Sequence, residues 1–131
     1  MKAFAKMAAP VIMIAGLIFT LTPGSASAAG SYKGCPYGAV CVYNGSTASS
    51  GIESGGTYWS YGPHNLSNQF GNHLVVNNQY GGAWAEGCTG YNGTGKGDWV
   101  ILAAPYGWVR NLTPINSIAL GTGNNYPCPP P

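Results

Sequence analysis

Charged residues are scarce in this chain of 131 residues, where Asp, Glu, Lys and Arg together make up 6%. Two of the five basic residues, Lys2 and Lys6, lie at the very start of the chain. The other three, Lys33, Lys96 and Arg110, are matched by three acidic residues, so the remainder has no formal net charge. Proteins bind nucleic acids and anionic membranes through basic surfaces. We therefore expect neither as a partner.

Long segments without glycine or proline are also missing. The chain contains 21 Gly and 10 Pro, and beyond residue 28 the longest stretch free of both is 72–80. An average helix needs about 11–12 residues, and an interior Gly costs about 1 kcal/mol. Short apolar runs separated by Gly-, Asn- and Ser-rich turns instead predict an all-β sandwich or barrel. The expected strands are 39–43, 57–61, 73–77, 99–103, 107–112 and 117–120.

Residues 1–28 have the pattern of an export signal. Lys2 and Lys6 precede an apolar run over 7–21, and Ser25-Ala26-Ser27-Ala28 provides an A-x-A cleavage site. The apolar run is shorter than the roughly 20 residues that span a bilayer, which favours a cleaved signal peptide over a membrane anchor. We expect a secreted protein in which 29–131 form one domain with a proline-rich tail, without membrane association after cleavage.

All four cysteines lie beyond the leader, at Cys35, Cys41, Cys88 and Cys128. An even number in a small exported protein indicates two disulfides. Three connectivities are possible, and the sequence does not decide among them. We favour Cys35–Cys41, because Pro36-Tyr37-Gly38 is a turn-forming segment between them, together with Cys88–Cys128, which would tie the tail to the domain.

No pattern of catalytic or metal-ligating residues is evident. A zinc site made of cysteines with His64 and His73 is an alternative to the disulfides, but the chain has no C-x₂-C pair. Gly-x-Ser-x-Gly, His-Glu-x-x-His and phosphate-binding loops are also missing. Glu53 and Glu86 would be the carboxylates of a glycosidase, and we interpret both as residues of solvated loops. We expect no enzyme, no metal and no cofactor.

Two short motifs recur in the same order. Tyr43-Asn44-Gly45-Ser46 returns as Tyr91-Asn92-Gly93-Thr94, and Asn65-Leu66-Ser67 returns as Asn111-Leu112-Thr113. An apolar run follows the second motif in each copy. Repetition with order and spacing kept predicts two related β-motifs, each about 45 residues long, packed face to face.

This pattern resembles the βγ-crystallin-like fold, in which two Greek-key motifs form one sandwich domain. The chain is more specifically similar to the secreted metallopeptidase-inhibitor family of actinomycetes. The segments that carry the resemblance are the leader, Cys35-Pro36-Tyr37-Gly38-Ala39-Val40-Cys41-Val42-Tyr43, His64-Asn65-Leu66-Ser67-Asn68-Gln69-Phe70-Gly71 and Asn111-Leu112-Thr113-Pro114-Ile115-Asn116-Ser117-Ile118. The resemblance covers about residues 34–121 and implies a disulfide-stapled domain whose first motif ends near Asn77 and whose second begins near Ala83.

The chain departs from the calcium-binding members of that fold. Their loops carry an Asn-Asp-x-x-Ser-Ser pattern, whereas the corresponding segments here, 72–76 and 116–120, contain no carboxylate. Calcium favours several oxygen ligands that include Asp or Glu. We therefore expect no calcium at these positions.

The resemblance implies a secreted, monomeric protein that inhibits an extracellular peptidase, with metallopeptidases among the candidate targets. The alternative is a module of the same fold that binds cell-wall polysaccharide or is antimicrobial, and a structural envelope protein without a single ligand remains a third. If 57–61 is a strand, its side chains alternate between two faces, so some of Tyr58, Trp59 and Tyr61 must face outward. Exposed Tyr and Trp side chains suit sugar stacking as well as protein contacts.

The segment 87–97 is the candidate partner-binding loop. It is tethered by Cys88, and it carries Tyr91, Asn92 and Lys96 among glycines that let another chain approach closely. A nearby disulfide limits the freedom that is lost on binding. The alternative is a plain hairpin turn equivalent to Tyr43–Ser46 that contacts no partner.

Overall fold

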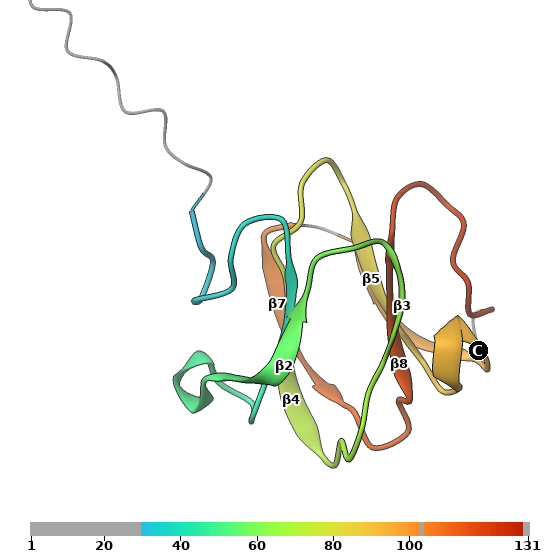
Figure 1. The fold of residues 1–131 in the computed structure, drawn as a ribbon, viewed down its shortest axis with the longest axis horizontal. Helices are drawn as coiled ribbons and strands as arrows, with labels where there is room; N and C mark the ends of the chain where they lie inside the picture. Colours follow the sequence, from blue (N-terminus) through green and yellow to red (C-terminus); the bar gives the residue numbers. More distant parts are fainter. Residues whose placement is uncertain (1–29, 103, 130–131) are drawn as a thin grey trace, which may run out of the picture.

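The computed structural model describes residues 30–102 and 104–129, so the predicted signal peptide lies outside this part. The described chain forms two four-stranded antiparallel sheets (Figure 1). The first contains β2 (Ile52–Tyr58), β1 (Val40–Tyr43), β4 (Asn72–Asn77) and β7 (Tyr106–Asn111) in that order. The second contains β3 (Gly62–Asn65), β8 (Ser117–Gly121), β5 (Trp84–Cys88) and β6 (Gly97–Ile101). The prediction of an all-β domain is confirmed.

Helical structure is confined to two single 3₁₀ turns, η1 (Ala48–Ser50) and η2 (Tyr91–Gly93), within the described residues. Over the same part of the chain, no helix has the length and apolar character needed to cross a membrane. The frequent glycines and prolines explain why helical structure is so short, because they interrupt the chain before a helix of ordinary length can form.

Most predicted strands coincide with observed ones, and the exceptions have local causes. The strand predicted at 57–61 is wrong at both ends, because β2 begins at Ile52 and stops at Tyr58, which pairs with Val40 at the start of β1. The strand predicted at 99–103 is β6, which ends at Ile101, and Ala103 lies outside the described residues. Strands β3 and β5 were not predicted at all.

The two halves of the chain exchange their third strands. Strand β3 pairs with β8 of the second half, and β7 pairs with β4 of the first half. The repeated motif occupies equivalent places, since Asn65 ends β3 and Asn111 ends β7. The following leucines are both buried, and their N–H groups donate to the loop before the adjacent strand: Leu66 to Asn116 O at 2.9 Å, and Leu112 to Gly71 O at 2.8 Å.

The central core lies between the two sheets. It consists of buried apolar side chains from strands of both sheets and from the connections that follow β3 and β7: Val40, Val42, Leu66, Val75, Ala85, Trp99, Ile101, Leu112, Ile115, Ile118 and Leu120. Burying one side chain of this kind contributes about 1.5–3 kcal/mol. The core is therefore aliphatic with one tryptophan, and most other aromatic side chains lie elsewhere.

Each sheet also has an apolar outer face that a terminal segment covers. On the first sheet, the N-terminal segment is joined by the Cys35–Cys41 disulfide and packs beside Tyr43. On the second, the C-terminal tail is joined by Cys88–Cys128 and contacts Trp84. The blue and red terminal segments accordingly lie on opposite sides of the sandwich (Figure 1). All four cysteines are paired, and both disulfides are the ones favoured from the sequence.

Two hydrogen bonds to backbone oxygens of the tail and one ring contact complete its attachment. The indole N–H of Trp84 donates to Gly123 O at 3.0 Å, and the Trp84 ring lies 4.9 Å from that of Tyr126. Gly97 N donates to Pro129 O at 2.7 Å, at the edge of β6. The tail after β8 is thus an integral layer of the domain.

Candidate functional site

Three loops meet at one end of the sandwich, the lower end in Figure 1. They are the β3–β4 connection 66–71, the β5–β6 connection 89–96 and the β7–β8 connection 112–116. The strand register brings them together, since Asn72 pairs with Asn111 and Ser117 pairs with both Asn65 and Cys88. We call this region the loop end.

The binding loop predicted at 87–97 is shorter in the structure, because β5 extends to Cys88 and β6 begins at Gly97. Cys88 is completely buried in β5, so it anchors the loop without reaching a partner. Tyr91 is 55% exposed and Lys96 is also exposed, as the prediction requires. Asn92 contacts Asn65 of β3 through two hydrogen bonds. Asn65 Nδ2 donates to Asn92 Oδ1 at 2.9 Å, and the backbone N of Asn92 donates to Asn65 Oδ1 at 2.7 Å. Asn92 therefore links the loop to β3.

The connection 89–96 is a compact turn closed by its own hydrogen bonds. Thr89 and Lys96 form its base, because Thr89 N donates to Lys96 O at 2.9 Å and Lys96 N donates to Thr89 Oγ1 at 2.8 Å. Gly90 N donates to Thr94 O at 2.9 Å inside that base. A Cβ at Gly90 would lie 2.8 Å from the backbone C of Thr94, so only glycine fits there. The turn is rigid, and Tyr91 projects from it.

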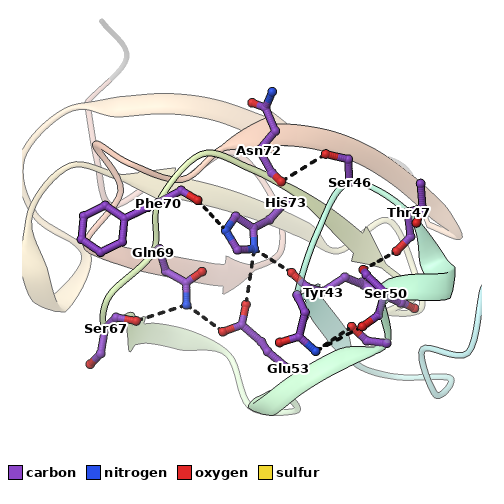
Figure 2. Close-up of polar contacts among 12 residues, drawn as sticks. Tyr43, Ser46, Thr47, Ser50, Glu53, Ser67, Gln69, Phe70, Asn72 and His73 are labelled. Atoms are coloured by element: carbon purple, nitrogen blue, oxygen red, sulfur yellow. Dashed lines mark hydrogen bonds and ion pairs between the residues drawn. The ribbon is translucent and has the colours of Figure 1, made fainter.

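The β3–β4 connection is held by a network of polar side chains (Figure 2). The ring nitrogens of His73 lie 2.7 Å from Tyr43 O and 3.1 Å from Phe70 O. Glu53 Oε1 lies 3.9 Å from His73 Nδ1, and Gln69 Nε2 donates to Glu53 Oε2 at 2.7 Å. The backbone of the loop is therefore fixed on both sides of Phe70, whose side chain is nevertheless 75% exposed.

Phe70 and Tyr91 line the same shallow cavity of about 210 Å³. Its floor is formed by buried Leu66 and Ile115, and polar side chains of the three loops surround it. The cavity is small, so the two projecting rings and not the hollow are the prominent features. Such an end presents fixed apolar groups to a partner.

The two acidic residues considered for catalysis are not on solvated loops, and that interpretation is wrong for both. Glu53 lies in β2, half-buried against His73 and Gln69. Glu86 lies in β5 with 1% of its surface exposed, and its Oε2 accepts a hydrogen bond from Cys128 N at 3.3 Å. Burial raises the pKa of Glu86, and that backbone N–H partly offsets the rise.

The structure also places the groups proposed for the alternative zinc site. All four cysteines form disulfides, so no thiolate is available to complete a site with His64 or His73. His64 lies beside the Tyr58 ring, with Nε2 2.8 Å from Ser60 O. Glu86 lies close to the sulfurs of Cys88 and Cys128, but both belong to the disulfide and this cluster is therefore no metal site.

Sequence reasoning missed Phe70 and its support. The sequence indicated only that 64–71 ends a structural motif and that His73 is a strand residue or, in the alternative, a zinc ligand. A bulky apolar residue flanked by Gln69 and Gly71 in a polar loop was the available signal. Nothing local, however, indicated that Glu53, far away in the sequence, would hold this loop in place.

No family model, curated protein or solved structure matches the chain. The function is therefore inferred from the geometry of the described residues and from the resemblance stated above.

Proposed function

We propose that this is a secreted βγ-crystallin-like binding protein, made of two Greek-key motifs, that blocks an extracellular peptidase. The strand order supports the fold, because a Greek key returns its fourth strand beside its first. Strand β4 lies beside β1, and β8 lies beside β5. The two disulfides agree with export, since disulfides persist in oxidising compartments.

One observation carries the proposed activity: the loop end exposes Phe70 and Tyr91 on backbones that hydrogen bonds already hold in place. Binding is weakened by the entropy lost when loops and side chains become ordered, and this loss is small for a loop ordered beforehand. Aromatic side chains supply much of the energy at protein interfaces, particularly where they fill a pocket of the partner. Peptidases have such pockets beside the catalytic centre, which a projecting ring can occupy.

The backbone geometry of the turn is consistent with inhibition without cleavage. Peptidases bind the segment that they cleave in an extended conformation, with its backbone groups free to pair with the enzyme. Around Tyr91 the chain instead forms a 3₁₀ turn, and Thr94 N donates to Tyr91 O at 3.2 Å. A turn that keeps this hydrogen bond can occupy the active-site cleft of a peptidase. Its peptide bonds are then not aligned for attack by the nucleophile of the peptidase.

Inhibition assays with substituted proteins test the proposal. The mature protein is titrated against a thermolysin-like metallopeptidase and against serine peptidases, and stoichiometric inhibition of one of them is expected. Phe70→Ala combined with Tyr91→Ala should weaken inhibition by about 2 kcal/mol or more, roughly 30-fold, and Lys96→Ala by less.

The matched control is Tyr106→Ala, which removes an aromatic side chain that is 42% exposed and lies at the other end of β7 from the loop end. This variant should inhibit like the native protein. Unchanged inhibition by the folded Phe70/Tyr91 double variant would exclude the loop end as the site. Failure to inhibit any peptidase of either class would overturn the proposed function itself.

A further inference from the structure

The opposite end of the sandwich carries a second group of exposed aromatic side chains. Strand register places it there, because Val40 at the start of β1 pairs with both Tyr58 and Asn77, the last residues of their strands. The connections beyond those strands therefore emerge together, at the upper end in Figure 1. These connections and the segment before β1 carry four aromatic rings that are between 43% and 59% exposed: Tyr37, Trp59, Tyr61 and Tyr80.

Three of these rings surround a small cavity. Trp59, Tyr61 and Tyr80 line a hollow of about 140 Å³ together with Gly38. Tyr80 stands over Gly38, where a Cβ would lie 2.9 Å from its ring, and packs against the Tyr37 ring with centroids 5.0 Å apart. Glycine at this position thus keeps the Tyr80 ring close to the domain and beside the cavity.

Gln79 lines the same cavity and has a buried acceptor without a partner. Its side chain is 3% exposed, and its Nε2 donates to Asn77 Oδ1 at 3.0 Å and to Trp84 O at 3.1 Å. Because both partners are acceptors, the side-chain atom that faces them must be the donor Nε2. The acceptor Oε1 is therefore on the other side of the amide. Among the described residues, no group hydrogen-bonds to Oε1. A buried polar atom left unpaired is costly and uncommon in folded proteins.

We propose that this cavity binds one ring of a neutral polysaccharide. A sugar ring has an apolar C–H face that packs on aromatic rings, and hydroxyl groups that suit the polar part of the lining, to which Gln79 and the two tyrosines belong. The part of the chain that the structure describes contributes no charged residue to the cavity, so an ionic ligand would be held without a counter-charge. A purely apolar side chain of a protein partner would cover these polar lining groups without a hydrogen bond.

The size of the cavity favours a polymer. Pockets that enclose small molecules have volumes of about 300–1,000 Å³, so this one takes a single ring and leaves the neighbouring rings outside. Tyr37 lies beside Tyr80 and extends the aromatic surface for a second ring. Because this end is opposite the loop end, the protein would hold an extracellular polysaccharide and a peptidase at the same time.

Binding to insoluble polysaccharides tests the inference. Mature protein is mixed with cellulose, chitin or peptidoglycan, and the bound fraction is measured over a range of polymer concentrations. Retention on at least one polymer is expected, and Trp59→Ala combined with Tyr80→Ala should weaken it at least about tenfold. Both side chains are exposed, so the variant should melt at the native temperature. A soluble oligosaccharide of the retained polymer should change tryptophan fluorescence in the native protein and not in Trp59→Ala.

The matched control is the double variant Phe70→Ala with Tyr91→Ala, which removes the same amount of exposed aromatic surface at the other end and should be retained like the native protein. Equal loss in both double variants, native-like retention of the Trp59/Tyr80 variant, or retention on none of the polymers would overturn the inference. Peptidase inhibition is measured on the same samples. Native inhibition by the Trp59/Tyr80 variant would support a separate site, and its loss would assign this end to the peptidase instead.

Discussion

Removing the Cys88–Cys128 disulfide tests whether the C-terminal tail stabilises the domain as a folded layer. The perturbation is the double substitution Cys88→Ala with Cys128→Ala, compared with Cys35→Ala and Cys41→Ala. All four side chains are completely buried, so both pairs lose similar packing. The bridges differ in the length of chain they close, with sequence separations of 40 and 6 residues.

The magnitude follows from the entropy of loop closure. A crosslink over the longer loop stabilises the folded chain by about 4 kcal/mol, and one over the shorter loop by about 2 kcal/mol. The difference corresponds to a melting temperature lower by about 6 °C or more for the variant that lacks the tail bridge. Its tail would still form the hydrogen bonds of Trp84 with Gly123 and of Gly97 with Pro129.

Urea and thermal unfolding of the two variants, without reductant, provide the measurement. The tail-bridge variant should unfold first, and limited proteolysis should cut it beyond Gly121 before any other site. Denatured native protein, left unreduced, should contain no thiol that a reagent labels, since all four cysteines are paired. If the Cys35/Cys41 variant is equally or less stable, closure of the tail loop does not dominate and the reasoning is refuted.

Two further predictions concern β5. Burial raises the pKa of Glu86 above its usual 4.5, so its contribution to stability is present in acid and lost as pH rises through the raised value. The variant Glu86→Gln keeps an acceptor for Cys128 N. When unfolding is measured at several pH values, the native protein should lose stability relative to this variant as the pH rises towards neutral. A difference in stability that stays constant with pH would contradict the prediction. Gly87→Ala would place a Cβ 2.6 Å from Cζ2 of Trp99 and should cost about 1–3 kcal/mol in urea unfolding. Gly45→Ala, with 3.4 Å to its nearest neighbour, is the control and should cost clearly less.

The all-β class was predictable because it follows from composition and from short local runs. Strand β5 was not, since Glu86 and Gly87 both lower the strand propensity of their segment. In the structure Glu86 is stabilised by an N–H from the tail, and Gly87 leaves the space that the Trp99 ring occupies. Both reasons lie in distant parts of the chain, and no window of sequence contains them.

Strand β3 was missed for a different reason. Its sequence Gly-Pro-His-Asn reads as a turn, because Pro63 has no N–H to donate to a neighbouring strand. The strand lies at the edge of its sheet and pairs on one side only, where proline is tolerated. Whether a strand lies at an edge is a property of the assembled sheet, which propensity alone does not give.

The candidate site was predictable in part. The exposure of Tyr91 and Lys96 followed from their glycine-rich surroundings. The role of Asn92 did not, because its partner Asn65 belongs to the other repeated motif and meets it only after the sheets form. The two halves that repeat each other in sequence thus also touch in the structure.

The exchange of third strands means that the chain does not divide into two separate small domains. Strand β3 pairs with β8 alone and β7 with β4 alone, so each half, once cut between β4 and β5, would lack the neighbour of its own third strand. A second copy of the same half carries an equivalent strand, because the two halves share their motifs. Such a fragment is expected to pair with itself, and the intact protein then corresponds to a twofold dimer whose subunits are joined covalently by a short linker.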